Sequence, residues 1–273
     1  MAILTEDGYI AAPKQIIPFA KTATRTSVAL IPFSTFDLAG NPGAGVIAGT
    51  STTAGVVPTA STAGCPVINA FGGGSVGYLS RVEYANTVAS RILLSDLLWK
   101  AGAYTFTAAT VTVTAPPSYL TRTPDGAGNG CEIWIEVTTA FLTGTAWQVQ
   151  VTYTNQAGTA ARTTIISAAQ AAAALTLGKK FMLALQAGDS GVRAIESVII
   201  TNGGTAMTAG NFNVLVQRPL WGNRVLVANG GGIDDIFKTG MPIVYATSAL
   251  VVDIQADSTS TGLPDLLIEI ANG

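Results

Sequence analysis

The stretch Trp147-Gln148-Val149-Gln150-Val151-Thr152-Tyr153-Thr154 decides the fold class of this protein. Its large apolar residues stand at the odd positions, and its polar residues stand at the even positions. A period of two is typical of a β-strand with one face in a core and the other in solvent or against a partner. The turn residues Asn155-Gln156-Ala157-Gly158 follow, and residues 161–166 can return as the second strand of a hairpin.

Short strand signals recur on both sides of this hairpin. Thr110–Thr114 alternates and ends before Pro116, and Glu132–Val137 carries aliphatic residues at its odd positions. Turn clusters separate most of the further segments that we predict as strands, which are 180–186, 193–201, 213–218, 224–228, 243–246, 250–255 and 266–270. Many short strands with few helices between them predict an all-β fold, an antiparallel β-sandwich or jelly-roll with one or two short helices.

Two segments favour a helix. In Ser90–Lys100 the leucines at 93, 94, 97 and 98 follow helical spacing, and Gly102 can end the element. Ala168–Leu175 is rich in alanine and predicts a short helix that closes near Gly178.

Residues 1–70 differ from the rest, because proline and glycine recur there and disfavour long regular elements. We predict an extended N-terminal arm over 1–70 and a β-sandwich domain over 71–273. The arm carries apolar anchors such as Phe19, Phe33 and Phe36. Two interpretations remain open: an arm that becomes ordered along a neighbouring subunit, and a long surface loop on the same chain.

The composition points to an assembly component. Charged residues make up 11% of the chain, against roughly 25% in an average soluble domain. A neutral surface of small residues is suited to packing against other chains. No run of basic residues stands out among 14 Lys and Arg, so we expect no direct binding of nucleic acid.

We expect a soluble protein with no membrane partner. The first residues include Glu6 and Asp7 and lack basic residues, which argues against a signal peptide. The longest apolar stretches, such as 243–252, fall short of the roughly 20 residues that span a bilayer. Cys65 and Cys131 can form one disulfide, although assembly in a reducing cytosol favours two free thiols.

The chain has no histidine, which excludes Ser-His-Asp and Cys-His sites as well as histidine-ligated zinc. Residues 72–77 match both the nucleophile-elbow pattern, with Ser75 as the nucleophile, and the dinucleotide-binding pattern. Without a base for Ser75 or a βαβ unit, a flexible glycine turn is the better interpretation. We therefore expect no catalytic residue, no cofactor and no bound metal, and a protein that is not an enzyme.

Three acidic pairs have the oxygen ligands that calcium prefers, but none has EF-hand spacing. These pairs are Asp234 with Asp235, Asp253 with Asp257, and Asp265 with Glu269. The favoured interpretation is carboxylates in solvated turns, or ion-pair partners of Arg224 and Lys238.

Glu132 and Glu136 share one strand face about 13 Å apart, which is too wide for a glycosidase pair. Trp134 between them suggests either a sugar platform or an anchor buried against a neighbouring subunit, and we favour the anchor. The aromatic residues that we predict at interfaces are Phe19, Phe33, Phe36, Trp134 and Trp221.

An ordered set of stretches also resembles a known family. Glu132–Val137, 151–163, 185–193 and Gln217-Arg218-Pro219-Leu220 are together similar to structural proteins encoded in tailed-bacteriophage genomes. The resemblance covers roughly residues 78–220, and its motifs are turns and strands that specify a fold more than a chemistry.

The resemblance implies a virion component, a capsid cement or decoration protein that binds the major capsid protein and itself as a symmetric dimer or trimer. Such a protein lies on the capsid surface after assembly in the host cytoplasm. The alternatives are a tail, collar or fibre protein and a carbohydrate-binding β-sandwich module.

Overall fold

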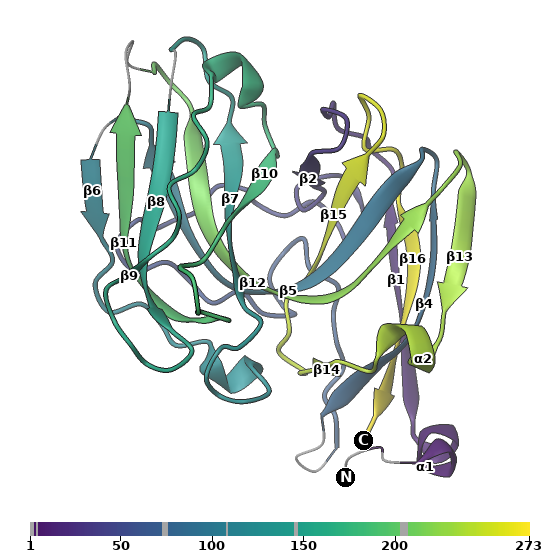
Figure 1. The fold of residues 1–273 in the computed structure, drawn as a ribbon. Helices are drawn as coiled ribbons and strands as arrows, with labels where there is room; N and C mark the ends of the chain where they lie inside the picture. The colour runs from purple at the N-terminus through teal and green to yellow at the C-terminus, as the bar shows by residue number, and fades with distance from the viewer. Residues whose placement is uncertain (1–2, 4, 73–75, 108, 145–146, 203–206) are drawn as a thin grey trace. The chain divides into compact units, whose positions relative to one another are not determined.

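The computed structural model describes residues 3, 5–72, 76–107, 109–144, 147–202 and 207–273 (Figure 1). The chain divides into two compact units. Unit 1 comprises Met1–Val46, Thr59–Asp96 and Leu220–Gly273, and unit 2 comprises Ile47–Pro58 and Leu97–Pro219. The chain passes between the units at Val46–Ile47, at Pro58–Thr59 and within two long strands, β5 (Ser90–Thr105) and β12 (Asn211–Val225).

Unit 1 consists of antiparallel strands in two layers, with two short helices. One layer has the strand order β13-β4-β16-β1-β3, with β14 paired to β4. In the other layer, β15 pairs with the first residues of β5 on one side and with β2 on the other. The bounds of these elements are α1 (Glu6–Ala11), β1 (Lys14–Lys21), β2 (Pro32–Ser34), β3 (Gly40–Asn41), β4 (Gly77–Asn86), β13 (Gly230–Asp234), α2 (Ile236–Thr239), β14 (Ile243–Val244), β15 (Leu250–Ala256) and β16 (Asp265–Asn272).

Inward-pointing side chains from the strands of both layers form the core of unit 1. In β4, Leu79 and Val82 are fully buried, and in β15 the inward residue Ile254 is fully buried as well. Phe19 from β1 joins the same cluster. In β4 buried and partly exposed residues largely alternate, whereas nearly every residue of β15 is buried.

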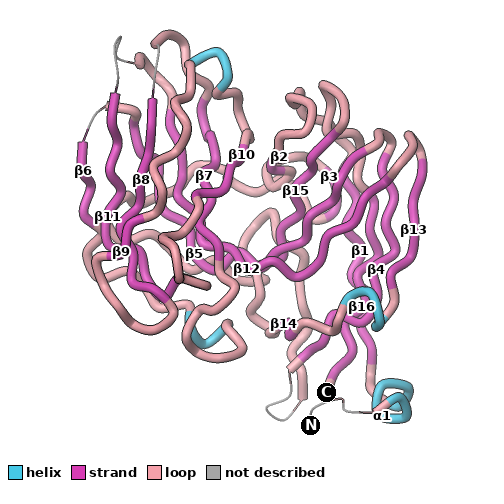
Figure 2. Tube along the Cα trace, in the orientation of Figure 1, coloured by secondary structure: helices cyan, strands magenta, loops and turns pink. Residues whose placement is uncertain are grey.

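Unit 2 is also antiparallel. One sheet has the order β6-β11-β8-β9, and β10, β7, β12 and the last residues of β5 belong to the other. The strands are β6 (Ala109–Thr112), β7 (Glu132–Thr139), β8 (Trp147–Asn155), β9 (Arg162–Thr163), β10 (Lys180–Leu183) and β11 (Val192–Asn202), with 3₁₀ turns at Leu120–Arg122 and Ala172–Ala174. Figure 2 shows that strands and loops make up most of the chain and that helices are few and short.

An aromatic cluster fills the core of unit 2. The ring centroids of Phe106 and Trp147 lie 4.2 Å apart, and those of Trp147 and Phe212 lie 5.1 Å apart. On β8 the odd-numbered residues 147, 149, 151 and 153 are all 0% exposed, as the alternation predicts. The predicted all-β fold with antiparallel sheets and short helices is confirmed.

The predicted helix over Ser90–Lys100 is wrong, because these residues belong to β5. Residues 90–96 pair with β15, and Leu94, Leu97 and Leu98 are all 3% exposed or less. A strand buried on both faces carries apolar residues at consecutive positions, and such a run cannot be distinguished from a helix by periodicity.

The predicted helix over Ala168–Leu175 is also wrong, since only Ala172–Ala174 forms a 3₁₀ turn. Gln170 exchanges two backbone hydrogen bonds with Trp147, with N–O distances of 2.8 and 2.9 Å. This bridge holds the backbone extended, and it outweighs the weak helix preference of a short alanine run.

The segment that the sequence predicts as an arm contributes to both units, with Ile47–Pro58 in unit 2 and the remainder in unit 1. Within unit 1, β1 pairs with β16 along seven residue pairs. No helix in the described part of the chain is long and apolar enough to cross a membrane. The glycine motif at 72–77 includes residues 73–75, which lie outside the described residues, and Gly77 begins β4.

Candidate functional site

Four of the five aromatic residues predicted at interfaces are buried within the chain. Phe19, Phe33, Phe36 and Trp221 are 2%, 0%, 6% and 8% exposed, whereas Trp134 is partly exposed. In this structure these four rings contribute to the interior of unit 1 rather than to its surface. A partner would therefore contact other side chains of unit 1.

Trp221 has a structural role in unit 1. Its ring lies 5.0 Å from that of Tyr84, and its indole N–H donates a 2.8 Å hydrogen bond to Asp234 Oδ2. Asp234 also accepts from Asn223 Nδ2 at 2.6 Å and from Lys238 Nζ at 3.2 Å. Burial of Asp234 raises its pKa, but the three hydrogen bonds outweigh this effect and hold the pKa below its ordinary value.

Trp134 is partly exposed on unit 2, and its polar contacts are with charged side chains. Its indole N–H donates to Glu132 Oε2 at 2.8 Å, and Lys180 Nζ lies 5.4 Å from the ring centroid. Met182 of β10 stands opposite Trp134 in the strand register and is 50% exposed. The indole N–H is already bonded to Glu132, and Lys180 lies over the ring. The geometry therefore suits apolar packing better than the stacking of a sugar.

Exposed uncharged side chains also lie beyond β10 on unit 2. Ile165 donates a 2.8 Å backbone hydrogen bond to the carbonyl of Ala184, two residues beyond Met182. Ile165 and Ile166 are 61% and 43% exposed. We call Trp134, Met182, Ala184 and Ile165 the unit 2 patch, and all four are uncharged.

Two carboxylates of the predicted acidic pairs form ion pairs with basic side chains. Asp257 lies 2.6 Å from Arg224 Nη2, and Asp234 lies 3.2 Å from Lys238 Nζ. The interpretation of these carboxylates as partners of Arg224 and Lys238 is confirmed. Cys65 and Cys131 are both buried thiols that are not joined by a disulfide, as favoured from the sequence.

Asp189 joins three segments of unit 2. Its carboxylate accepts from Tyr153 OH at 2.6 Å, from Asn155 Nδ2 at 2.7 Å and from Arg162 Nε at 2.9 Å. The hydrogen bond from Arg162, together with those from Tyr153 and Asn155, lowers the pKa of Asp189 to about 2. The side chain of Asp189 is 3% exposed, so this cluster stabilises the fold and offers little surface to a partner.

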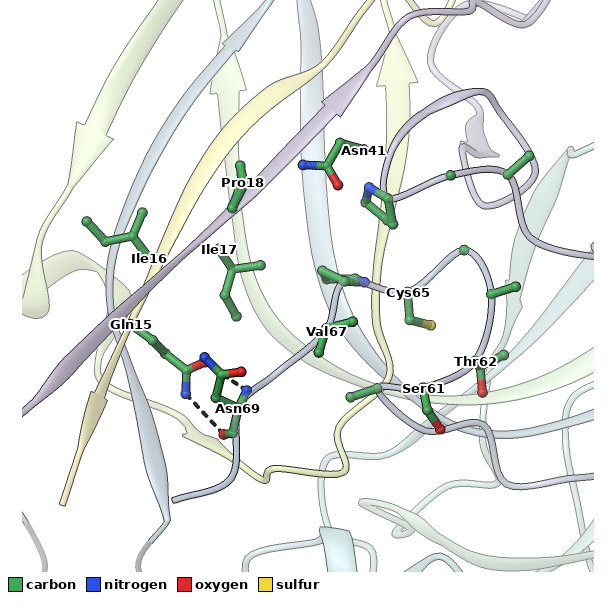
Figure 3. A pocket seen from close by; sticks show the side chains of 17 residues that line it. Gln15, Ile16, Ile17, Pro18, Asn41, Ser61, Thr62, Cys65, Val67 and Asn69 are labelled. Carbon is green, nitrogen blue, oxygen red and sulfur yellow. Dashed lines mark hydrogen bonds between the residues drawn. The ribbon is translucent and has the colours of Figure 1, made fainter. Parts of the chain in front are cut away.

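Unit 1 contains an uncharged pocket of about 530 Å³ beside β1, which we call the β1 pocket (Figure 3). Its lining contains no charged side chain and consists of Gln15, Ile16, Ile17, Pro18, Asn41, Pro42, Gly43, Ala44, Ala60, Ser61, Thr62, Ala63, Gly64, Cys65, Pro66, Val67 and Asn69. Ile16 and Val67 are 55% and 72% exposed. Sequence analysis missed this pocket; the one signal that could have pointed to an edge strand here is Pro18 within an apolar run.

A lysine is buried behind this region. Lys21 is 3% exposed, and its ammonium donates to the carbonyl oxygens of Leu38 and Pro42 at 3.1 and 2.8 Å. Burial lowers the pKa of Lys21 to about 8, against the opposing influence of Asp37 and Cys65.

A second apolar pocket of unit 1, of about 460 Å³, lies between α1 and α2. Phe237 and Ile10 line it and are 89% and 66% exposed. An aromatic ring left this open is uncommon on an isolated chain and marks a surface suited to contact with another molecule.

No protein-family model and no curated protein matches this chain. Among solved structures, one of the Gx strain of infectious bursal disease virus aligns over 96% of this chain and 80% of that chain, at 10% identity and a TM-score of 0.22. A VP2 subviral particle of the same virus aligns over the same shares, at 11% identity and a TM-score of 0.19. Similarities at this level support no argument about function.

Proposed function

We propose that this chain is a structural virion protein, a capsid cement or decoration protein that stabilises the major-capsid lattice of a tailed bacteriophage. The assignment to tailed bacteriophages follows from the resemblance of the stretches between residues 132 and 220. The proposal of an adhesive role follows from the surface of the chain.

The observation that carries the proposal is how little charge the surface retains. The chain has 14 basic and 16 acidic residues, and twelve of them are buried: Lys21, Arg25, Asp96, Lys100, Arg122, Glu136, Lys179, Lys180, Arg218, Asp234, Asp253 and Glu269. Several others, such as Arg162 and Arg224, are engaged in ion pairs within the chain. The remaining surface is mostly neutral.

Apolar side chains occupy part of that surface. Among the residues that the structure describes, seventeen large apolar side chains are exposed, including Phe237 in unit 1 and Met182 in unit 2. Desolvating neutral and apolar surface costs little, so such a surface favours contact with other chains. Contacts that are weak singly become strong when a symmetric lattice repeats them.

Quantitative mass spectrometry of purified particles tests this proposal. We expect a copy number comparable with that of the major capsid protein, and a lower temperature of genome release from particles that lack the chain. A copy number that matches a single vertex or the tail would contradict the proposal.

A further inference from the structure

The edge of β1 is incomplete on the side opposite β16. Antiparallel strands alternate, so that every second residue directs its N–H and C=O to the same neighbour. Pro13 O accepts from Asn272 N–H, and Lys21 N–H donates to Pro264 O, so the odd-numbered residues of β1 face β16. Thr22 N–H donates to the other side, where it meets Ala39 O.

The even-numbered residues of β1 therefore face β3, which pairs only with Ala20 and Lys21. In the described part of the chain, no strand partner lies opposite Ile16 and Pro18 on this side. Between Ile16 and Pro18 this edge offers one donor, Ile16 N–H, and two acceptors, the carbonyl oxygens of Ile16 and Pro18. Pro18 has no N–H to lose there, which is why a proline is tolerated inside this strand.

The 65–69 segment lies alongside this edge, and the β1 pocket lies between this segment and β1 (Figure 3). The side chain of Gln15 fixes the position of this segment by hydrogen bonds to Asn69. Asn69 N–H donates to Gln15 Oε1 at 3.0 Å, and Gln15 Nε2 donates to the carbonyl of Asn69 at 3.3 Å. This reciprocal pair fastens the 65–69 segment to the start of β1 and leaves the edge at Ile16–Pro18 uncovered.

The lining of the pocket defines the chemistry of an occupant. None of its seventeen residues is charged, so a charged ligand would lose its hydration without gaining an ionic partner. Regularly spaced backbone donors and acceptors are what a strand edge recognises, and apolar side chains such as Ile17 and Val67 flank them. A volume of about 530 Å³ is within the range of established binding pockets.

We propose that the β1 pocket binds an extended, uncharged peptide segment of a partner protein, which adds to the edge of β1 as a further strand. The segment donates N–H groups to the carbonyls of Ile16 and Pro18 and accepts from Ile16 N–H. This inference depends on unit 1 alone and goes beyond the proposed virion role, whose failure would leave it intact.

Two substitutions separate the edge from the pocket. Ile16→Pro removes the one backbone donor of the Ile16–Pro18 edge and leaves the bonds to β16 in place. Gly43→Leu adds a large side chain to the lining of the pocket without a clash, because a Cβ added at Gly43 meets no atom within 4 Å. Gly72→Leu is the matched control, since a Cβ at Gly72 also has open space and Gly72 does not line the pocket.

A library of random heptapeptides is screened for binding to the intact chain. The affinity of each selected peptide is then measured by fluorescence anisotropy. We expect uncharged, β-branched sequences, whose dissociation constants rise at least about tenfold with Ile16→Pro and with Gly43→Leu and stay unchanged with Gly72→Leu. Methylation of alternate peptide backbone nitrogens is expected to abolish binding. Circular dichroism establishes that each variant is folded.

Three results would overturn the proposal: a selection that yields no binder, a charged consensus, or affinities that neither Ile16→Pro nor Gly43→Leu changes. Sedimentation equilibrium tests a different occupant. If the chain alone self-associates and Gly43→Leu abolishes the association, the pocket holds a second copy of this chain and the proposed partner is wrong.

Discussion

Replacing Asp189 by asparagine is expected to weaken unit 2 by about 3 kcal/mol. The carboxylate accepts three hydrogen bonds of 2.6–2.9 Å from Tyr153, Asn155 and Arg162, and its side chain is 3% exposed. A hydrogen bond to a charged group contributes about 1.5–3 kcal/mol, and a buried donor left without an acceptor costs about 1–3 kcal/mol. The amide of asparagine retains one acceptor and turns two donors toward the groups that donated, so at least one bond is lost.

The same cluster makes unit 2 sensitive to acid. The pKa of Asp189 is lowered to about 2 from the ordinary 3.8, chiefly by the hydrogen bond from Arg162. Because the folded pKa lies below the unfolded one, the contribution is complete above about pH 4 and is lost as the pH falls toward 2. Asp189→Asn removes this part of the acid dependence.

Urea unfolding followed by tryptophan fluorescence measures both effects. Unit 2 contains Trp99, Trp134 and Trp147, so the signal reports mainly on that unit. Asp257→Asn is a control outside unit 2, because Asp257 belongs to unit 1 and its exposed ion pair with Arg224 is worth less than about 0.5 kcal/mol, so the unit 2 signal is expected to stay unchanged. A loss below about 1 kcal/mol for Asp189→Asn, or an unchanged slope of stability between pH 4 and 2, would refute the assigned role of this cluster.

Three further predictions concern unit 1 and the unit 2 patch. Ile17→Pro is expected to cost about 3 kcal/mol or more, because it removes a ladder hydrogen bond and a core side chain, whereas Ile16→Pro changes thermal unfolding little. Trp221→Phe is expected to cost about 1–3 kcal/mol through the lost bond to a carboxylate, and Trp134→Phe less than about 0.5 kcal/mol, both measured by urea titration. The pKa of Lys21 is lowered to about 8 from 10.5 by burial, so its contribution to stability rises with pH between these values, and Lys21→Met is expected to remove that rise in unfolding free energy.

Each of these predictions has an outcome that contradicts it. Equal losses of stability for Ile16→Pro and Ile17→Pro would mean that both edges of β1 are paired. A larger loss for Trp134→Phe than for Trp221→Phe would reverse the assignment of surface and interior. An alkaline rise in stability that persists unchanged in Lys21→Met would show that other groups cause it.

The sequence alone determined the strands whose burial is one-sided. Residues 147–154 alternate because one face meets the core and the other does not, so period, strand and inward side chains could all be predicted locally. Ser90–Lys100 could not be assigned in this way, because β5 is buried on both faces and its apolar run has no period of two. The extended backbone at Gln170 depends on Trp147, more than twenty positions away.

Only the tertiary structure decided which distant residues meet. The Asp189 cluster and the edge of β1 depend on strand pairing, and pairing is set by the burial of whole faces and by hydrogen bonds between segments far apart in the chain. The scarcity of charge in the sequence indicated an adhesive protein. Where its surface is open, at the β1 pocket and the unit 2 patch, depends on how the sheets pack, and no local pattern encodes it.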